Sequence, residues 1–194
     1  GATTSNNTII GANAGAFTLG SSNVAIGSGA LNSVYSAVDE TVAIGLNALT
    51  AALTTASSGA VGVGTRALVA LTTGAANTAL GKDAGAAVTT GSYNTMLGST
   101  ARSSTTASYN TIVGANSGSA ALGNNNTALG KSALATAGAV TDAVAIGANA
   151  LTSALTAGAN GSVAVGSSAL TLLTSGASNT AVGQNSGAAI TTGS

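Results

Sequence analysis

The chain has 194 residues, no net formal charge, and no Cys, His, Pro or Trp. Charged residues make up 4% of the sequence and hydrophobic residues 45%, whereas ordinary globular domains carry several times more charge. This composition excludes disulfide and thiol chemistry, a Ser-His triad, the usual zinc ligands and a basic patch for nucleic acid.

The sequence is organised by eleven copies of a five-residue motif: Asn, then Thr or Val, a small residue, a bulky aliphatic residue and Gly. The copy at residues 77–81 has Asn77, Leu80 and Gly81 in these places. Such a repeat predicts one structural unit per copy, stacked on its neighbours. The closing glycines are 16 to 19 residues apart and are Gly11, Gly27, Gly45, Gly64, Gly81, Gly98, Gly114, Gly130, Gly147, Gly166 and Gly183.

Each copy of the motif predicts a short β-strand that ends at its glycine. β-Branched and aliphatic residues alternate with small residues, which is typical of a strand. The glycine is expected to supply a positive φ or a tight bend. By this alternation the Thr or Val column and the aliphatic column share one face, and we expect that face to point inward.

The Asn that opens the motif is present in seven of the eleven copies. Stacked at the spacing of neighbouring strands, these amides are expected to hydrogen-bond up and down a ladder. The seven residues are Asn7, Asn23, Asn77, Asn94, Asn110, Asn126 and Asn179.

The segments between the motifs differ along the chain. Several early copies are followed by Ala-Leu and a longer apolar run, the middle copies by shorter segments, and the Ala-Leu type then returns. In the longer type Leu49 and Leu53 are four residues apart, which fits either one helical turn or a second short strand. Residues 41–92 and 143–194 align without a gap, so block copying of repeats accounts for part of the length.

These features predict an all-β fold, a parallel β-solenoid or β-roll of about eleven coils of 16–19 residues, with one-turn helices possible in the longer coils. Residues 1–194 would form one domain, and we expect it to be a segment of a longer fibrous protein. Each coil alone is too small to bury much apolar area, so stacking must stabilise it. The remaining flat apolar surface predicts lateral association into a homotrimer.

We expect neither an enzyme nor a cofactor site. An enzyme would need paired carboxylates in a groove, and the four acids lie in expected turns, where charged side chains are normally solvated. Gly130-Lys131-Ser132 imitates the end of a phosphate-binding loop, but Asn125 stands where an earlier glycine is required. Five charged residues lie one to four places after a motif glycine, which predicts exposed corners: Arg66, Lys82, Asp83, Arg102 and Lys131. The other acids are Asp39, Glu40 and Asp142.

Tyr93 and Tyr109 stand directly before Asn94 and Asn110 in consecutive copies. Stacked on the outside, they would offer an aromatic surface for a sugar receptor; the alternative is a packing pair between coils without a ligand. The Thr column also raises the hypothesis of an ice-binding face. Val residues in five copies, and the inward direction expected for that column, argue against it.

The motif resembles two families of fibrous surface proteins. Residues 23–30 and 162–169 (Asn-Val-Ala-Ile-Gly-Ser-Gly-Ala and Ser-Val-Ala-Val-Gly-Ser-Ser-Ala) look like head repeats of trimeric autotransporter adhesins, the YadA-like heads. Residues 179–183, with a Thr-Thr-Gly-Ser turn, look more like repeat arrays of bacteriophage tail fibres. The resemblance covers nearly the whole chain and implies a trimeric, left-handed parallel β-roll used for adhesion or host attachment. The adhesin repeat is typically shorter and more regular, which favours the tail-fibre family.

We therefore expect a structural and adhesive segment of a phage tail fibre that presents or forms a host-receptor-binding surface. The alternative is the head of a bacterial trimeric autotransporter adhesin that binds host cells or matrix, and an ice-binding solenoid is a minor alternative. Expected partners are further copies of the chain and a host-surface glycan or protein, without nucleic acid. The expected location is the virion surface or the bacterial cell surface. No membrane insertion is expected, because Gly, Ser, Thr or Asn interrupts every apolar run.

Overall fold

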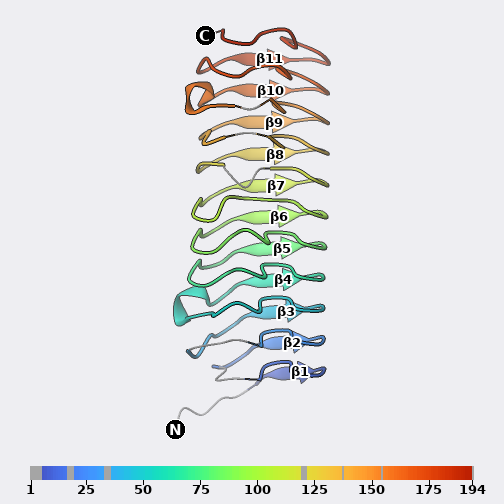
Figure 1. Cartoon of the computed structure of the whole chain (residues 1–194), viewed down its shortest axis with the longest axis vertical. Helices are drawn as coiled ribbons and strands as arrows, with labels where there is room; N and C mark the ends of the chain where they lie inside the picture. Colours follow the sequence, from blue (N-terminus) through green and yellow to red (C-terminus); the bar gives the residue numbers. More distant parts are fainter. Residues whose placement is uncertain are drawn as a thin grey trace.

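In the computed structural model the chain is a stack of coils, each with one short strand (Figure 1). The structure describes residues 6–16, 20–32, 36–118, 122–136, 138–153 and 155–193. One sheet holds the strands in sequence order, all neighbours are parallel, and the predicted parallel β-solenoid is confirmed. The strands are β1 (Thr8–Ile10), β2 (Val24–Ile26), β3 (Val42–Ile44), β4 (Val61–Val63), β5 (Thr78–Leu80), β6 (Thr95–Leu97), β7 (Thr111–Val113), β8 (Thr127–Leu129), β9 (Val144–Ile146), β10 (Val163–Val165) and β11 (Thr180–Val182).

Equivalent motif residues pair with one another in register. In β5 and β6, for example, Ala79 pairs with Met96 and Leu80 with Leu97. The pairing continues into the corner, where the backbone N–H of Gly98 donates to the carbonyl of Leu80 at 2.8 Å. At a strand spacing of about 4.8 Å, eleven strands extend over roughly 50 Å.

The motif glycine lets successive corners stack closely. Gly81 has a φ of +138°, and a Cβ added there would lie 2.6 Å from both the carbonyl carbon and the carbonyl oxygen of Gly98. A side chain would therefore strain the backbone and collide with the next coil. The positive φ expected from the sequence is confirmed, and it serves the contact between coils.

The strand side chains point in the opposite direction to the one expected from the sequence. From β2 to β11 the central residue of each strand is buried, while the Thr or Val and the aliphatic residue beside it are half-exposed or exposed. Ala79 is fully buried, for example, and Leu80 is 51% exposed. The expectation of an inward aliphatic column is wrong because the coil is thin. A Cβ on Gly62 would lie only 3.2 Å from Leu49 Cδ1, which comes from the opposite wall.

Two columns of residues fill the core, and in the middle coils small residues in one column occur together with large residues in the other. Four places after most motif glycines stands a buried Leu with positive φ, but the middle coils have Gly85, Arg102 and Gly118 there. The large strand centres Met96 and Ile112 occur in these middle coils. A Cβ on Gly85 would lie 2.9 Å from Met96 Cε, and one on Gly118 would lie 2.8 Å from Ile112 Cδ1. The buried residues of the column are Leu31, Leu49, Leu68, Leu134, Leu151 and Leu170.

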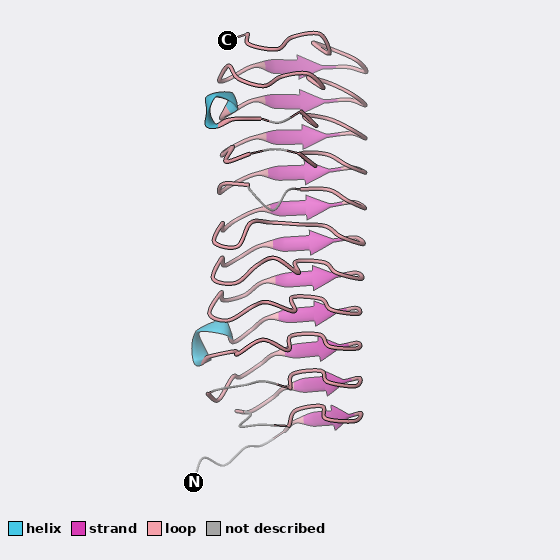
Figure 2. Cartoon of the chain, viewed as in Figure 1, coloured by secondary structure: helices cyan, strands magenta, loops and turns pink. Residues whose placement is uncertain are grey.

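Two single 3₁₀ turns are the helical elements of the described residues, η1 (Thr55–Ser57) and η2 (Ala157–Ala159) (Figure 2). They occupy equivalent places in the two copies of the duplicated block. Leu49 lies in a turn and Leu53 in an isolated bridge. Neither a helical turn nor a regular second strand therefore spans these two residues, and the helical turn of the long coil begins just after them.

Candidate functional site

A ladder of buried amides joins the middle coils on the side where the chain enters the strands. The backbone N–H and Nδ2 of Asn94 both donate to Asn77 Oδ1 at 3.0 Å. Asn110 repeats this pattern on Asn94 at 3.0 and 3.2 Å, and Asn126 repeats it on Asn110 at 2.8 and 3.1 Å. Each amide also reaches a turn carbonyl of the next coil, as Asn110 Nδ2 does with Gly123 O at 3.0 Å. The ladder expected for seven Asn residues is thus confirmed for these four, and it is structural because they are buried.

The outward side chains of the strands form one continuous surface along the stack, which we call the strand face. It is apolar or Thr-bearing in every coil, and Leu129 at its middle is 46% exposed. No motif-column residue of this face is charged. The strand face consists of Thr8, Val24, Val42, Val61, Thr78, Thr95, Thr111, Thr127, Val144, Val163 and Thr180, with Ile10, Ile26, Ile44, Val63, Leu80, Leu97, Val113, Leu129, Ile146, Val165 and Val182.

The structure brings Tyr93 and Tyr109 together at the corner that precedes the strands. Their rings are stacked with centroids 5.2 Å apart and planes 5° from parallel, and the residues are 55% and 60% exposed. The next two coils place Asn125 and Asp142 in the same column, where Asn125 Nδ2 donates to Asp142 Oδ1 at 3.1 Å. The sequence pointed to the tyrosines but not to this polar continuation of their column.

The corners after the strands hold the ion pairs of the described residues. Arg66 Nε lies 3.1 Å from Asp83 Oδ1, and Lys82 Nζ lies 3.3 Å from Asp83 Oδ2. The Asp83 side chain is only 17% exposed, and its Oδ1 is buried without accepting a hydrogen bond. Asp39 and Glu40 are exposed, as expected from the sequence. Asp83 differs because the two cations cover it.

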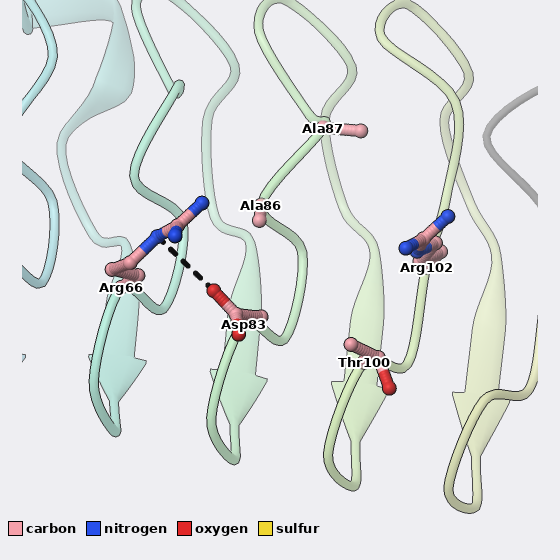
Figure 3. A pocket seen from close by; sticks show the side chains of 6 residues that line it. All are labelled: Arg66, Asp83, Ala86, Ala87, Thr100 and Arg102. Carbon is pink, nitrogen blue, oxygen red and sulfur yellow. Dashed lines mark ion pairs between the residues drawn. The ribbon is translucent and has the colours of Figure 1, made fainter.

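Arg66 and Asp83 also line a hollow of about 320 Å³ together with Ala86, Ala87, Thr100 and Arg102 (Figure 3). The side chains come from loop segments that cross over the strands, and Arg66 and Asp83 point toward one another. A second hollow of about 180 Å³ is lined by Thr100, Arg102, Asn116, Gly118 and Ala135. Sequence reasoning missed this region. Its one signal was Arg102, which stands in a column that otherwise holds Leu or Gly.

Neither a metal cluster nor a membrane-spanning helix occurs in the part of the chain that the structure describes. Its residues include no group of three or more acids, Cys or His placed to hold a metal ion. Among the same residues there is also no helix with the length and apolar character needed to cross a membrane.

Comparisons of the chain with protein-family models, with curated proteins and with solved structures returned no match. The candidate functional features are the strand face, the stacked pair Tyr93 and Tyr109, which we call the tyrosine corner, and the hollows beside Arg102.

Proposed function

We propose that this chain is a structural and adhesive segment of a fibre, of the kind found in phage tail fibres, whose copies associate through their strand faces. The observation that carries the proposal is the outward direction of the aliphatic column in every coil. Three-residue strands over eleven coils give a face of roughly 500 Å². The largest apolar patch on a typical monomer is about 300–600 Å² and is often functional.

The shape of the strand face favours partners of the same kind. A strip that continues through every coil is covered along its whole length only by another elongated surface lying beside it. A cyclic homotrimer meets this requirement, because each strand face turns toward the common axis and contacts both neighbours in a closed arrangement. The tyrosine corner and the loop side of the coils then remain available for a host-surface glycan or protein.

The strand face also supports a second candidate, an ice-binding surface. Six coils, four of them consecutive, present Thr in one outward column, so the inward direction expected from the sequence no longer argues against this function. Val in the other five coils interrupts the array. A monomer that produces thermal hysteresis in ice-growth measurements would favour this candidate over self-association.

Charge placed on the strand face tests the proposal. The double variant Leu80→Lys/Leu129→Lys puts two ammonium groups among apolar side chains, which must be desolvated on association. We expect it to be a monomer by light scattering under conditions in which the unmodified chain is a trimer. The matched control is Leu172→Lys/Ile190→Lys, which changes two exposed aliphatic residues in loops and should leave the mass unaltered. Equal masses for both double variants would refute the strand face as the interface.

A further inference from the structure

The two hollows beside Arg102 adjoin each other, and we treat them together as one groove along the stack. They share Thr100 and Arg102, and their other lining residues come from the coils on either side. From Arg66, which follows β4, to Ala135, which follows β8, the groove crosses successive coils. We call it the arginine groove. Its length runs parallel to the stack, so it suits an extended ligand better than a compact one.

The arginine groove coincides with the interruption of the buried Leu column. Where other coils place Leu in the core, Arg102 is exposed and its neighbours in the column are Gly85 and Gly118. The core beneath is filled from the strands by Met96 and Ile112 instead. Arg102 therefore makes no contribution to core packing of the kind made by the Leu residues, and its side chain is available at the surface.

Positive charge is concentrated along this groove. Arg66 and Arg102 line it together with a single carboxylate, that of Asp83, which Arg66 and the neighbouring Lys82 already contact. Within the described residues no carboxylate lies at ion-pair distance from Arg102. A chain with no net charge thus carries a local excess of positive charge with one guanidinium left unpaired.

The groove also offers polar and apolar contacts of the kind that sugars use. Thr100 donates its hydroxyl hydrogen to Asn116 Oδ1 at 2.6 Å, which leaves the Thr100 oxygen as an acceptor and the Asn116 amide hydrogens as donors. The methyl groups of Ala86 and Ala87 supply a small apolar surface between the two arginines.

We propose that the arginine groove binds an acidic polysaccharide, with the guanidinium groups of Arg102 and Arg66 holding carboxylates of successive sugars. A guanidinium pairs with a carboxylate through two parallel hydrogen bonds, which gives both charge and geometric selectivity. This inference rests on the proposed adhesive function, since it names the class of receptor that the fibre would engage. It places receptor binding on the loop side, away from the strand face.

The test measures binding of the unmodified chain to immobilised polygalacturonate, with dextran as the neutral polymer and poly(glycerol phosphate) as the phosphate polymer. We expect binding to polygalacturonate, none to dextran, and weaker binding to the phosphate polymer. Arg102→Gln should weaken polygalacturonate binding by about tenfold or more, as expected for loss of a charged hydrogen-bonding group. Lys131→Gln removes the same charge from an exposed residue outside the groove and should change binding less than twofold.

Several results would overturn the inference. Equal loss in Arg102→Gln and Lys131→Gln would show attraction to net charge alone, and absence of polygalacturonate binding would remove the site. Tighter binding to poly(glycerol phosphate) would replace the carboxylate assignment by phosphate. Circular dichroism and solution mass of each variant keep the two proposals separate. A trimer that does not bind sugar contradicts only the groove, whereas a monomer that binds through Arg102 contradicts only the association.

Discussion

The middle coils and the flanking coils build the same strand on two different interiors. In the flanking coils a small strand centre such as Ala145 faces a buried Leu column, represented by Leu134 and Leu151. In the middle coils Met96 and Ile112 fill the core from the strand side, and the Leu column is absent. The loss of Leu from one wall is therefore partly offset by larger side chains from the other, in keeping with close packing.

The same two regions differ in their buried polar groups. From Asn77 to Asn126 the amide ladder is unbroken, and every amide bonds to the next. In the flanking region the backbone N–H of Asn23 donates to Asn7 Oδ1 at 2.8 Å, and Asn23 Oδ1 accepts the backbone N–H of Thr41 at 2.9 Å. Because Thr41 carries no side-chain amide, the ladder stops at that coil. The other motif copies without Asn have Ala60, Ala143 and Ser162 in this place, all buried.

The motif determines how the coils stack, whereas the residues that fill the core are exchangeable. The glycine corner and the in-register strand recur in both regions, whatever fills the interior. The middle coils add a polar ladder and lose the Leu column, and Arg102 lies exposed in the place that Leu holds in the flanking coils. In the proposed function, the middle coils would carry receptor binding and the flanking coils would extend the fibre.

The largest expected effect is the loss of a ladder amide from the middle coils. Asn110→Ala leaves the backbone N–H of Asn126 buried without its acceptor and removes the hydrogen bonds that the two Asn110 amide hydrogens donate. At about 1–3 kcal/mol for the orphaned donor and about 0.5–1.5 kcal/mol for each of the two lost hydrogen bonds, the free energy of unfolding should fall by roughly 2–6 kcal/mol. Urea denaturation followed by circular dichroism measures it. The exposed amide variant Asn124→Ala is the control and should cost less than about 1 kcal/mol; similar losses in both would mean that burial of the ladder is unimportant.

The next largest effect is expected when the strand side no longer fills the core of the middle coils. Met96→Ala removes the side chain that occupies the space left by Gly85, so a cavity should reduce the free energy of unfolding by about 2–5 kcal/mol. Met96→Leu nearly conserves volume and should cost less than about 1.5 kcal/mol. The same urea titration compares them. If Met96→Ala lowers the free energy of unfolding no more than Met96→Leu does, the middle coils do not depend on a large side chain from the strand to fill their core.

The smallest effect concerns the ion pairs of the middle coils. Asp83→Asn removes the carboxylate that Arg66 and Lys82 contact, but their side chains are 57% and 70% exposed and screened by water. The free energy of unfolding should change by less than about 1 kcal/mol. A loss as large as that of Asn110→Ala would show that Asp83 supports the fold rather than the charge of the groove.

The repeat made most of the fold predictable from the sequence. The period of the motif glycines gave the coils, the alternation gave the strands, and the Asn column gave the ladder, because each is a property of every copy. The direction in which the strand side chains point was not predictable in the same way. Large aliphatics such as Leu80 are normally expected inside, and only the thinness of the coil, set by the opposite Leu column, reverses them.

The candidate sites also differ in how far the sequence could predict them. Tyr93 and Tyr109 lie in equivalent places of consecutive copies, so their stacking followed from the period. The arginine groove depends on side chains from different columns, Arg66 and Arg102, and on the volume left between coils. Considering each column of the motif separately therefore could not predict the arginine groove.

The mass of the unmodified chain in solution tests the central claim most directly. Light scattering should give three times the 17.7 kDa of one chain, because the strand face is covered only when copies lie side by side. A monomer that remains soluble at high concentration would contradict the account. It would show that the outward aliphatic columns tolerate water or serve another ligand.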